Sequence, residues 1–171
     1  MAVRLCLWVS GEAGILRASH DQTIAHMSHD DLQMDLTSGV AAFEAKFFQK
    51  AMALLSPLAQ QGNPDAQYRM AIMFQNGLGY VKNEAEAMRW MRAAADQGMA
   101  LALHGLGFMY LNGECVAKDE ARAAIYFRQA AEQGLPGSAM TLGMMYEQGL
   151  GVEKNEAEAK KWYQRAEGGG Q

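Results

Sequence analysis

The fold is decided by a stretch that repeats three times without a gap: LAQQGNPDAQYRMAIMFQNGLGYVKNEAEAMRWMRA (58–93), AADQGMALALHGLGFMYLNGECVAKDEARAAIYFRQ (94–129) and AAEQGLPGSAMTLGMMYEQGLGVEKNEAEAKKWYQR (130–165). The same residue type returns every 36 residues, for example at Gly77, Gly113 and Gly149. Agreement at a single spacing over three copies is the signature of a repeat architecture, in which each unit is one supersecondary element.

Each copy predicts two helices. The first, over about 64–75, has an apolar stripe of Ala66, Met70, Met73 and Phe74 at i, i+4, i+7 and i+8, which is one face of an α-helix. The second, over about 84–96, has an equivalent stripe with Trp90 at its centre. Two apolar faces in each copy predict a helical hairpin that buries one helix against the other.

Cap residues predict where these helices begin and end. Glycines of the loop NGLGYVKN are suited to the left-handed geometry of a helix end. The residue before each second helix has a side chain suited to an N-cap: Asn83, Asp119 and Asn155. Glu86 and Glu158 stand three residues later, where they could complete a capping box.

Small residues beside the core-facing stripe of each first helix predict how the hairpins assemble. Ala71, Gly107 and Gly143 would let a neighbouring backbone approach closely, so we expect each hairpin to lean on the next. The predicted fold class is therefore all-α, an α-solenoid of stacked antiparallel helix pairs with 36-residue repeats. We expect a right-handed superhelix with a concave side lined by the first helices.

These residues together resemble the Sel1-like repeat, a relative of the tetratricopeptide repeat with a longer loop between its helices. The third copy carries the pattern most fully, with Leu142, Gly143, Tyr146, Gly149, Gly151, Val152, Asn155, Ala159 and Trp162. The second copy departs from it at Cys115, which occupies the position of the loop's second glycine. The resemblance implies a non-catalytic scaffold that binds other proteins. Some disulfide-rich relatives bind cell-wall-like or β-lactam ligands, which leaves a small-ligand, enzyme-associated role as the alternative.

The domain organisation follows from the extent of the repeats. We expect a repeat domain over 41–171, with a helix over 41–61 followed by repeats 58–93, 94–129 and 130–165. Residues 41–57 resemble the second helix of a degenerate earlier copy. Residues 1–40 are expected to form a poorly defined leader, whose opening MAVRLCLWVSGEAGIL resembles a signal sequence weakly. We expect a cytoplasmic protein, or a periplasmic or secreted one if that opening is a signal sequence.

Composition and motifs exclude several classes of function. The 171 residues carry a net charge of −4 without a basic run, which disfavours nucleic acid and anionic membranes as partners. No apolar run is long enough to span a membrane, and two cysteines do not make a disulfide scaffold. No catalytic, phosphate-binding or metal-binding motif is present, so we predict no catalytic residue, cofactor or metal. The pair His26 and His29 lacks a third fixed ligand.

The predicted binding site is a stripe on the first helices, opposite their core-facing side and so on the expected concave face of the solenoid. We name it the first-helix stripe and expect it to bind a partner protein or peptide through these residues: Tyr68, Ile72, Gln75, Leu101, His104, Phe108, Leu111, Met140, Met144 and Glu147. The stripe is apolar for an exposed surface, and aromatic side chains are the expected anchors. The alternative is that neighbouring first helices or the leader bury it. A second predicted contact is self-association through the C-terminal helix around 156–167.

Overall fold

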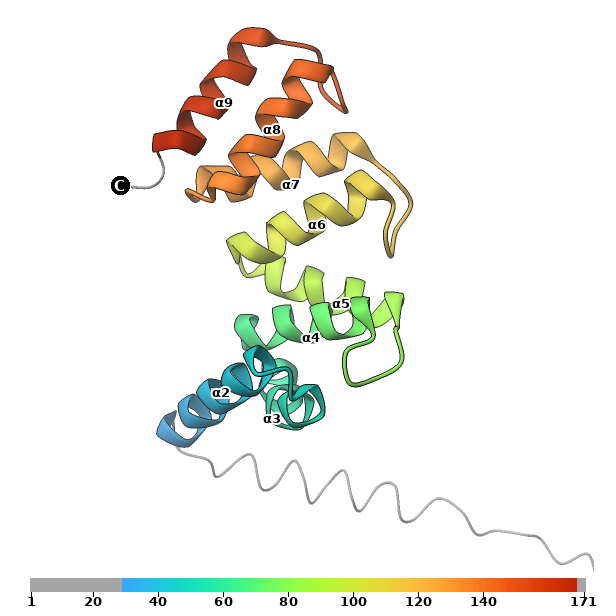
Figure 1. Cartoon of the computed structure of the whole chain (residues 1–171), viewed down its shortest axis with the longest axis vertical. Helices are drawn as coiled ribbons and strands as arrows, with labels where there is room; N and C mark the ends of the chain where they lie inside the picture. Colours follow the sequence, from blue (N-terminus) through green and yellow to red (C-terminus); the bar gives the residue numbers. More distant parts are fainter. Residues whose placement is uncertain (1–28, 169–171) are drawn as a thin grey trace, which may run out of the picture.

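The structure, a computed structural model, describes residues 29–168, which contain eight helices and no strands. The helices are α2 (His29–Glu44), α3 (Phe48–Gln60), α4 (Pro64–Asn76), α5 (Glu84–Asp96), α6 (Ala100–Asn112), α7 (Glu120–Glu132), α8 (Pro136–Gln148) and α9 (Glu156–Gly168). They follow one another along the long axis of the molecule, with α2 at one end and α9 at the other (Figure 1). The predicted all-α solenoid of helix pairs is confirmed.

The same hydrogen bond closes each of the three long hairpin loops. The backbone N–H of Asn83 donates to the carbonyl of Phe74 at 2.9 Å. Its counterparts 36 and 72 residues later run from Asp119 to Tyr110 at 2.8 Å and from Asn155 to Tyr146 at 2.9 Å. The three hairpins therefore share one backbone design, as the 36-residue period predicts.

The predicted N-caps are formed, but the predicted capping boxes are not. The side-chain oxygens of Asn83, Asp119 and Asn155 each accept a hydrogen bond from a backbone N–H three residues later, at 3.0–3.1 Å. A capping box would need the backbone N–H of Asn83, which the carbonyl of the preceding helix already takes. The Glu86 carboxylate instead pairs with Arg89 at 2.6 Å.

The prediction of one helix over 41–61 is wrong, because the chain turns within it. Helix α2 ends at Glu44, Lys46 adopts a left-handed φ of 62°, and α3 begins at Phe48. Residues 29–60 thus form a fourth hairpin, and most of α2, residues 29–40, lies within the range 1–40 that the sequence assigned to the leader. Its loop has three residues where the later hairpins have seven, a difference of 4 that breaks the 36-residue spacing. Residues 1–28, which include the signal-like opening and His26, lie outside the described part.

The small residues of the first helices pack against side chains of their own hairpin. A Cβ atom on Gly107 would lie 2.7 Å from the Phe127 ring, and one on Gly143 would lie 2.6 Å from the Tyr163 ring. At Gly107 and Gly143, the expectation that a neighbouring backbone approaches is therefore wrong. These positions are small because an aromatic ring of the second helix lies across them, where a methyl group would clash.

Successive hairpins meet closely at the loops instead. A Cβ atom on Gly151 would overlap the carbonyl carbon of Glu120 and lie 2.5 Å from the backbone nitrogen of Ala121, at the start of α7. Cys115, at the equivalent loop position, has a φ of 61° and so keeps the left-handed geometry despite its side chain. Burial, followed by the charge of Glu84, raises the pKa of the Cys115 thiol, which disfavours the reactive thiolate.

Arginine–tyrosine hydrogen bonds join neighbouring hairpins. Arg92 on α5 donates to the Tyr110 hydroxyl at 3.2 Å, and Arg128 on α7 donates to the Tyr146 hydroxyl. We expect Tyr146→Phe to lower the free energy of unfolding by about 1 kcal/mol in urea titration, because it removes the acceptor and leaves the ring. Tyr80→Phe is the matched control, since the Tyr80 ring is exposed. An equal effect of both substitutions would contradict the role of the hydrogen bond.

Candidate functional site

The first-helix stripe lies on α4, α6 and α8, and none of its ten residues is fully buried. Leu101, Phe108 and Met140 are 43%, 38% and 49% exposed, which is high for large apolar side chains. Glu147 is exposed as well. The remaining six residues are half-buried: Tyr68, Ile72, Gln75, His104, Leu111 and Met144. Within the described residues, neighbouring helices therefore cover this stripe only in part.

An aromatic cluster supports the middle of the stripe. The ring of His104 lies 4.8 Å from that of Phe108 and 5.6 Å from that of Phe127, and the two phenylalanine rings are 5.1 Å apart. All three pairs meet edge to face, a favoured aromatic geometry. Phe127 reaches the cluster from α7 and is fully buried. The exposed Phe108 is therefore held in place by a rigid partner beneath it.

His104 connects the stripe on α6 to α8. Its Nδ1 atom lies 2.7 Å from the hydroxyl of Ser138, which is fully buried. Burial lowers the pKa of His104 below its ordinary value of 6.5. The 36-residue period puts Ser138 at the position of Ala66 in the core-facing stripe, where a contact with His104 is not expected. A hydroxyl at a position where the other copies have Ala66 and Ala102 is the signal that could have indicated it.

The lowered pKa of His104 predicts a pH-dependent stability. Between the folded-state pKa and the ordinary value of 6.5, the unfolded chain binds more protons than the folded one. The free energy of unfolding should therefore fall as the pH falls through 6.5, and the loss should be absent above pH of about 7.5. We expect thermal unfolding from pH 7.5 to pH 5 to show a larger drop in Tm for the wild type than for His104→Asn. Equal drops would contradict the assignment.

Polar side chains near the C-terminal ends of α4 and α8 form hydrogen bonds at the margin of the stripe. Gln75 at the end of α4 donates to the Glu114 carboxylate at 3.1 Å, which links α4 to the loop after α6. Glu147 accepts a hydrogen bond from the Tyr163 hydroxyl at 2.8 Å. The helical pattern does not indicate Glu114 as a neighbour of the stripe, because this residue lies in the loop after α6 and not on the helix itself. The structure thus places acidic groups where α6 and α8 end.

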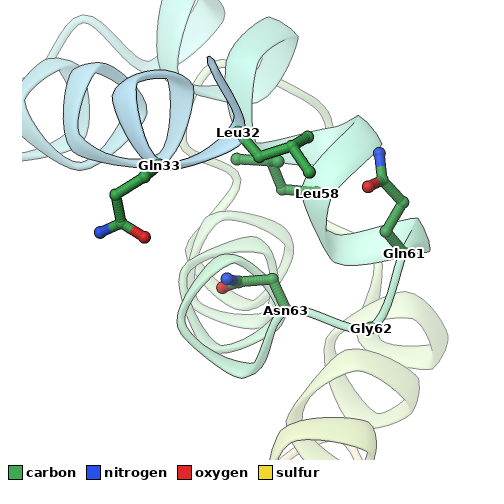
Figure 2. A pocket seen from close by; sticks show the side chains of 6 residues that line it. All are labelled: Leu32, Gln33, Leu58, Gln61, Gly62 and Asn63. Carbon is green, nitrogen blue, oxygen red and sulfur yellow. The ribbon is translucent and has the colours of Figure 1, made fainter. Parts of the chain in front are cut away.

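Two shallow pockets lie away from the first-helix stripe. One, of about 300 Å³, opens between α2 and the turn from α3 to α4. Figure 2 shows Leu32 and Leu58 side by side in it, with Asn63 at the turn. The Asn63 side chain already accepts a hydrogen bond from the backbone of α4 as its N-cap. The other pocket, of about 310 Å³, lies at the equivalent turn from α7 to α8, beneath Arg165. Neither contains a stripe residue.

The part of the chain that the structure describes contains no cluster of metal ligands and no helix suited to crossing a membrane. In the range 29–168, no group of three or more His, Cys, Asp or Glu side chains is placed to hold a metal ion. None of the eight helices is both long enough and apolar enough to cross a membrane. Cys115 is a free cysteine. What this surface offers chemically is an array of apolar contacts with a few polar groups at its margins.

Comparison with known proteins agrees with the fold. The family model for the Sel1 repeat matches residues 64–99, 100–135 and 138–168. No curated protein matches the chain. A Sel1 repeat protein from Oxalobacter formigenes is 36% identical with a TM-score of 0.74, over 78% of this chain and 55% of that one.

Two other solved structures are similar. A protective antigen present in uropathogenic Escherichia coli strains, described as displaying an SLR fold, is 29% identical with a TM-score of 0.77, over 91% of this chain and 33% of that one. Helicobacter pylori cysteine-rich protein B has a TM-score of 0.53 at 23% identity, over 85% of this chain and 93% of that one, and shows the fold alone. The chain spans about half or less of the first two relatives. Because the matched repeats make up more than half of its residues, the chain belongs to the Sel1 repeat family.

Proposed function

We propose that this protein is a non-catalytic adaptor that binds a partner protein or peptide through the first-helix stripe. Proteins built from Sel1 repeats generally act as scaffolds for protein interactions, which supports a binding role over a catalytic one. The observation that carries the proposal is the exposure of Leu101, Phe108 and Met140 along two neighbouring first helices. Large apolar side chains grouped on a surface mark interaction sites more often than isolated ones do.

The aromatic cluster adds a reason why binding should centre on α6. A rigid anchor loses little side-chain entropy when it binds, and Phe108 is already fixed by contacts with His104 and Phe127. The surrounding methionines, Met140 and Met144, are flexible and polarisable, so they can adapt to a partner's shape. The expected interface therefore combines one preorganised aromatic with an adaptable margin.

Site-specific photo-crosslinking tests this proposal. A photoreactive phenylalanine analogue at position 108 or 140 should capture a partner in cells, whereas the same analogue at position 125 should not. Ile125 is the matched control because it is 53% exposed and lies on α7, outside the stripe. Capture from position 125 alone would move the interface away from the first helices. Turnover of a β-lactam reporter that depends on an intact stripe would favour the small-ligand alternative.

Self-association through α9 is a separate part of the proposal. Tyr163 and Ala166 are half-buried on this helix. Lys160 and Glu167 are exposed and stand 36 residues after Ala124 and Ala131, which are buried on α7. A second copy cannot pack on α9 as α8 packs on α7 without burying two charges, so it would need a different register. Light scattering should then show a mass that rises with concentration, and a constant monomer mass from micromolar to millimolar would contradict it.

A further inference from the structure

Helices α6 and α8 present an uncharged surface that is unusual for this acidic chain. Helix α6, ALALHGLGFMYLN, carries no Asp, Glu, Lys or Arg, and α8, PGSAMTLGMMYEQ, carries only Glu147 near its end. The exposed apolar side chains of the first-helix stripe, Leu101, Phe108 and Met140, lie on these two helices. The part of a partner that contacts them must therefore be apolar, because a charge would lose water there without gaining a counter-ion.

The polar side chains on this surface are already engaged within the protein. His104 Nδ1 is hydrogen bonded to Ser138, and the Thr141 hydroxyl donates to the carbonyl of Gly137 at 2.9 Å. At the margin, Gln75 donates to Glu114. An extended peptide would bring unpaired backbone N–H and C=O groups onto Leu, Phe and Met side chains that cannot bond them, at a cost in free energy. A helix satisfies its own backbone and avoids this cost.

Charge distinguishes the two ends of the surface. Helix α6 ends at Asn112 beside Glu114, and α8 carries Glu147 in its last turn, so both acidic groups add to the negative ends of the helix dipoles. In the loops after α4 and α6, Lys82 pairs with Glu84 and Lys118 with Glu120, each at 2.8 Å. The loop after α8 carries one lysine, Lys154, next to Glu153. The first turns of α6 and α8 carry no acidic residue. The end near Glu114 and Glu147 is thus the acidic one.

We propose, on the basis of the protein-binding function above, that this surface binds the apolar face of an amphipathic α-helix whose basic end lies over Glu114 and Glu147. Leu101 and Leu111 are ten residues apart, or roughly 15 Å along α6, so a partner helix of about three turns would span the surface. The apolar face of such a helix meets Phe108 and the methionines, in a helix-in-groove mode of recognition.

Three labelled synthetic peptides test the proposal by fluorescence anisotropy with the full chain. The first is an 18-residue amphipathic helix with one Leu/Met face and three lysines at one end. The second has two central residues replaced by proline, which prevents the helix. The third has glutamates in place of the lysines. We expect the first peptide to bind at least tenfold more tightly than either of the others.

Protein variants then locate the site. Phe108→Asp should weaken binding of the first peptide at least tenfold. Met140→Asp should weaken it to the same extent, and the more exposed Met140 side chain makes this substitution easier for the fold to accommodate. Ile125→Asp, on α7, is the matched control and should leave binding unchanged. The double substitution Glu114→Gln with Glu147→Gln should remove the preference for lysine over glutamate. Circular dichroism of each variant confirms that its helices are retained.

Several results would overturn the proposal. One is that the proline peptide binds as tightly as the helical peptide, and another is that the glutamate peptide binds more tightly than the lysine peptide. A third is that Ile125→Asp weakens binding as much as Phe108→Asp does, and the last is that no peptide binds. Photo-crosslinking from positions 108 and 140 remains a separate measure. If it captures a partner while the helical peptide fails, the adaptor function stands and only the helical, basic partner is rejected.

Discussion

Replacing Phe127 with alanine is expected to lower the free energy of unfolding by about 3–5 kcal/mol, the usual cost of removing a buried aromatic side chain. Phe127 has no exposed surface and packs on Gly107 within its hairpin. Its ring also contacts His104 and Phe108, so the cavity would open directly beneath the first-helix stripe. Urea unfolding followed by circular dichroism measures the loss.

Ile125 on the same helix provides the control for this substitution. Ile125→Ala lies two residues away on the same helix and removes an exposed side chain, so its effect should stay within about 0.5 kcal/mol. Phe127→Ala should also weaken binding at Phe108 under conditions where the helices persist, since Phe108 loses its support. A loss of stability as small as that of Ile125→Ala would show that Phe127 does not hold α6 against α7.

Gly151→Ala is expected to cost roughly 2–3 kcal/mol, because two penalties combine. The residue has a φ of +66°, which an L side chain adopts only with strain. Its added methyl group would also overlap the backbone of Glu120 at the start of α7, so the loop from α8 to α9 must move away. Thermal unfolding measures the total. Hydrogen exchange should become faster in the loop residues 149–155.

Two other positions separate these penalties. Gly134 has a φ of +89° but open space around its Cβ position, so Gly134→Ala should show the conformational cost alone. Cys115 occupies the same loop position as Gly151 one repeat earlier and already has a left-handed φ, so Cys115→Gly should be neutral or stabilising. If Gly134→Ala costs as much as Gly151→Ala, the close approach of loop and helix contributes nothing.

The helices of the three repeats could be predicted from the sequence because their signals are local. Stripes at helical spacing and N-caps such as Asn83 depend on residues within one or two turns. The predicted range 84–96 coincides with α5, and the range 64–75 falls one residue short of the end of α4. The prediction of one helix over 41–61 is wrong because it rests on the fixed 36-residue spacing. A loop shortened by four residues shifts α2 out of the 36-residue register, and comparison by fixed spacing does not detect it.

The surroundings of the stripe could not be predicted in the same way. Helical periodicity predicts that the ten positions lie on the surface, and all ten are at least partly exposed. The contacts that define them as a site come from other helices and loops: Phe127 from α7, Ser138 from α8 and Glu114 from the loop after α6. Such contacts depend on crossing angles and rotamers, which a pattern along one helix does not contain.

The 36-residue repeat, the pair of helices in each copy and the inward face of each helix can all be read from the sequence alone. These features follow from periodicity and capping, which act over a few residues. Three contacts depend instead on how the hairpins pack: Gly107 against the Phe127 ring, the loop at Gly151 against α7, and His104 with buried Ser138. Those pairings join residues 20 to 34 positions apart, and their geometry is set when the hairpins pack together at the density of a protein interior.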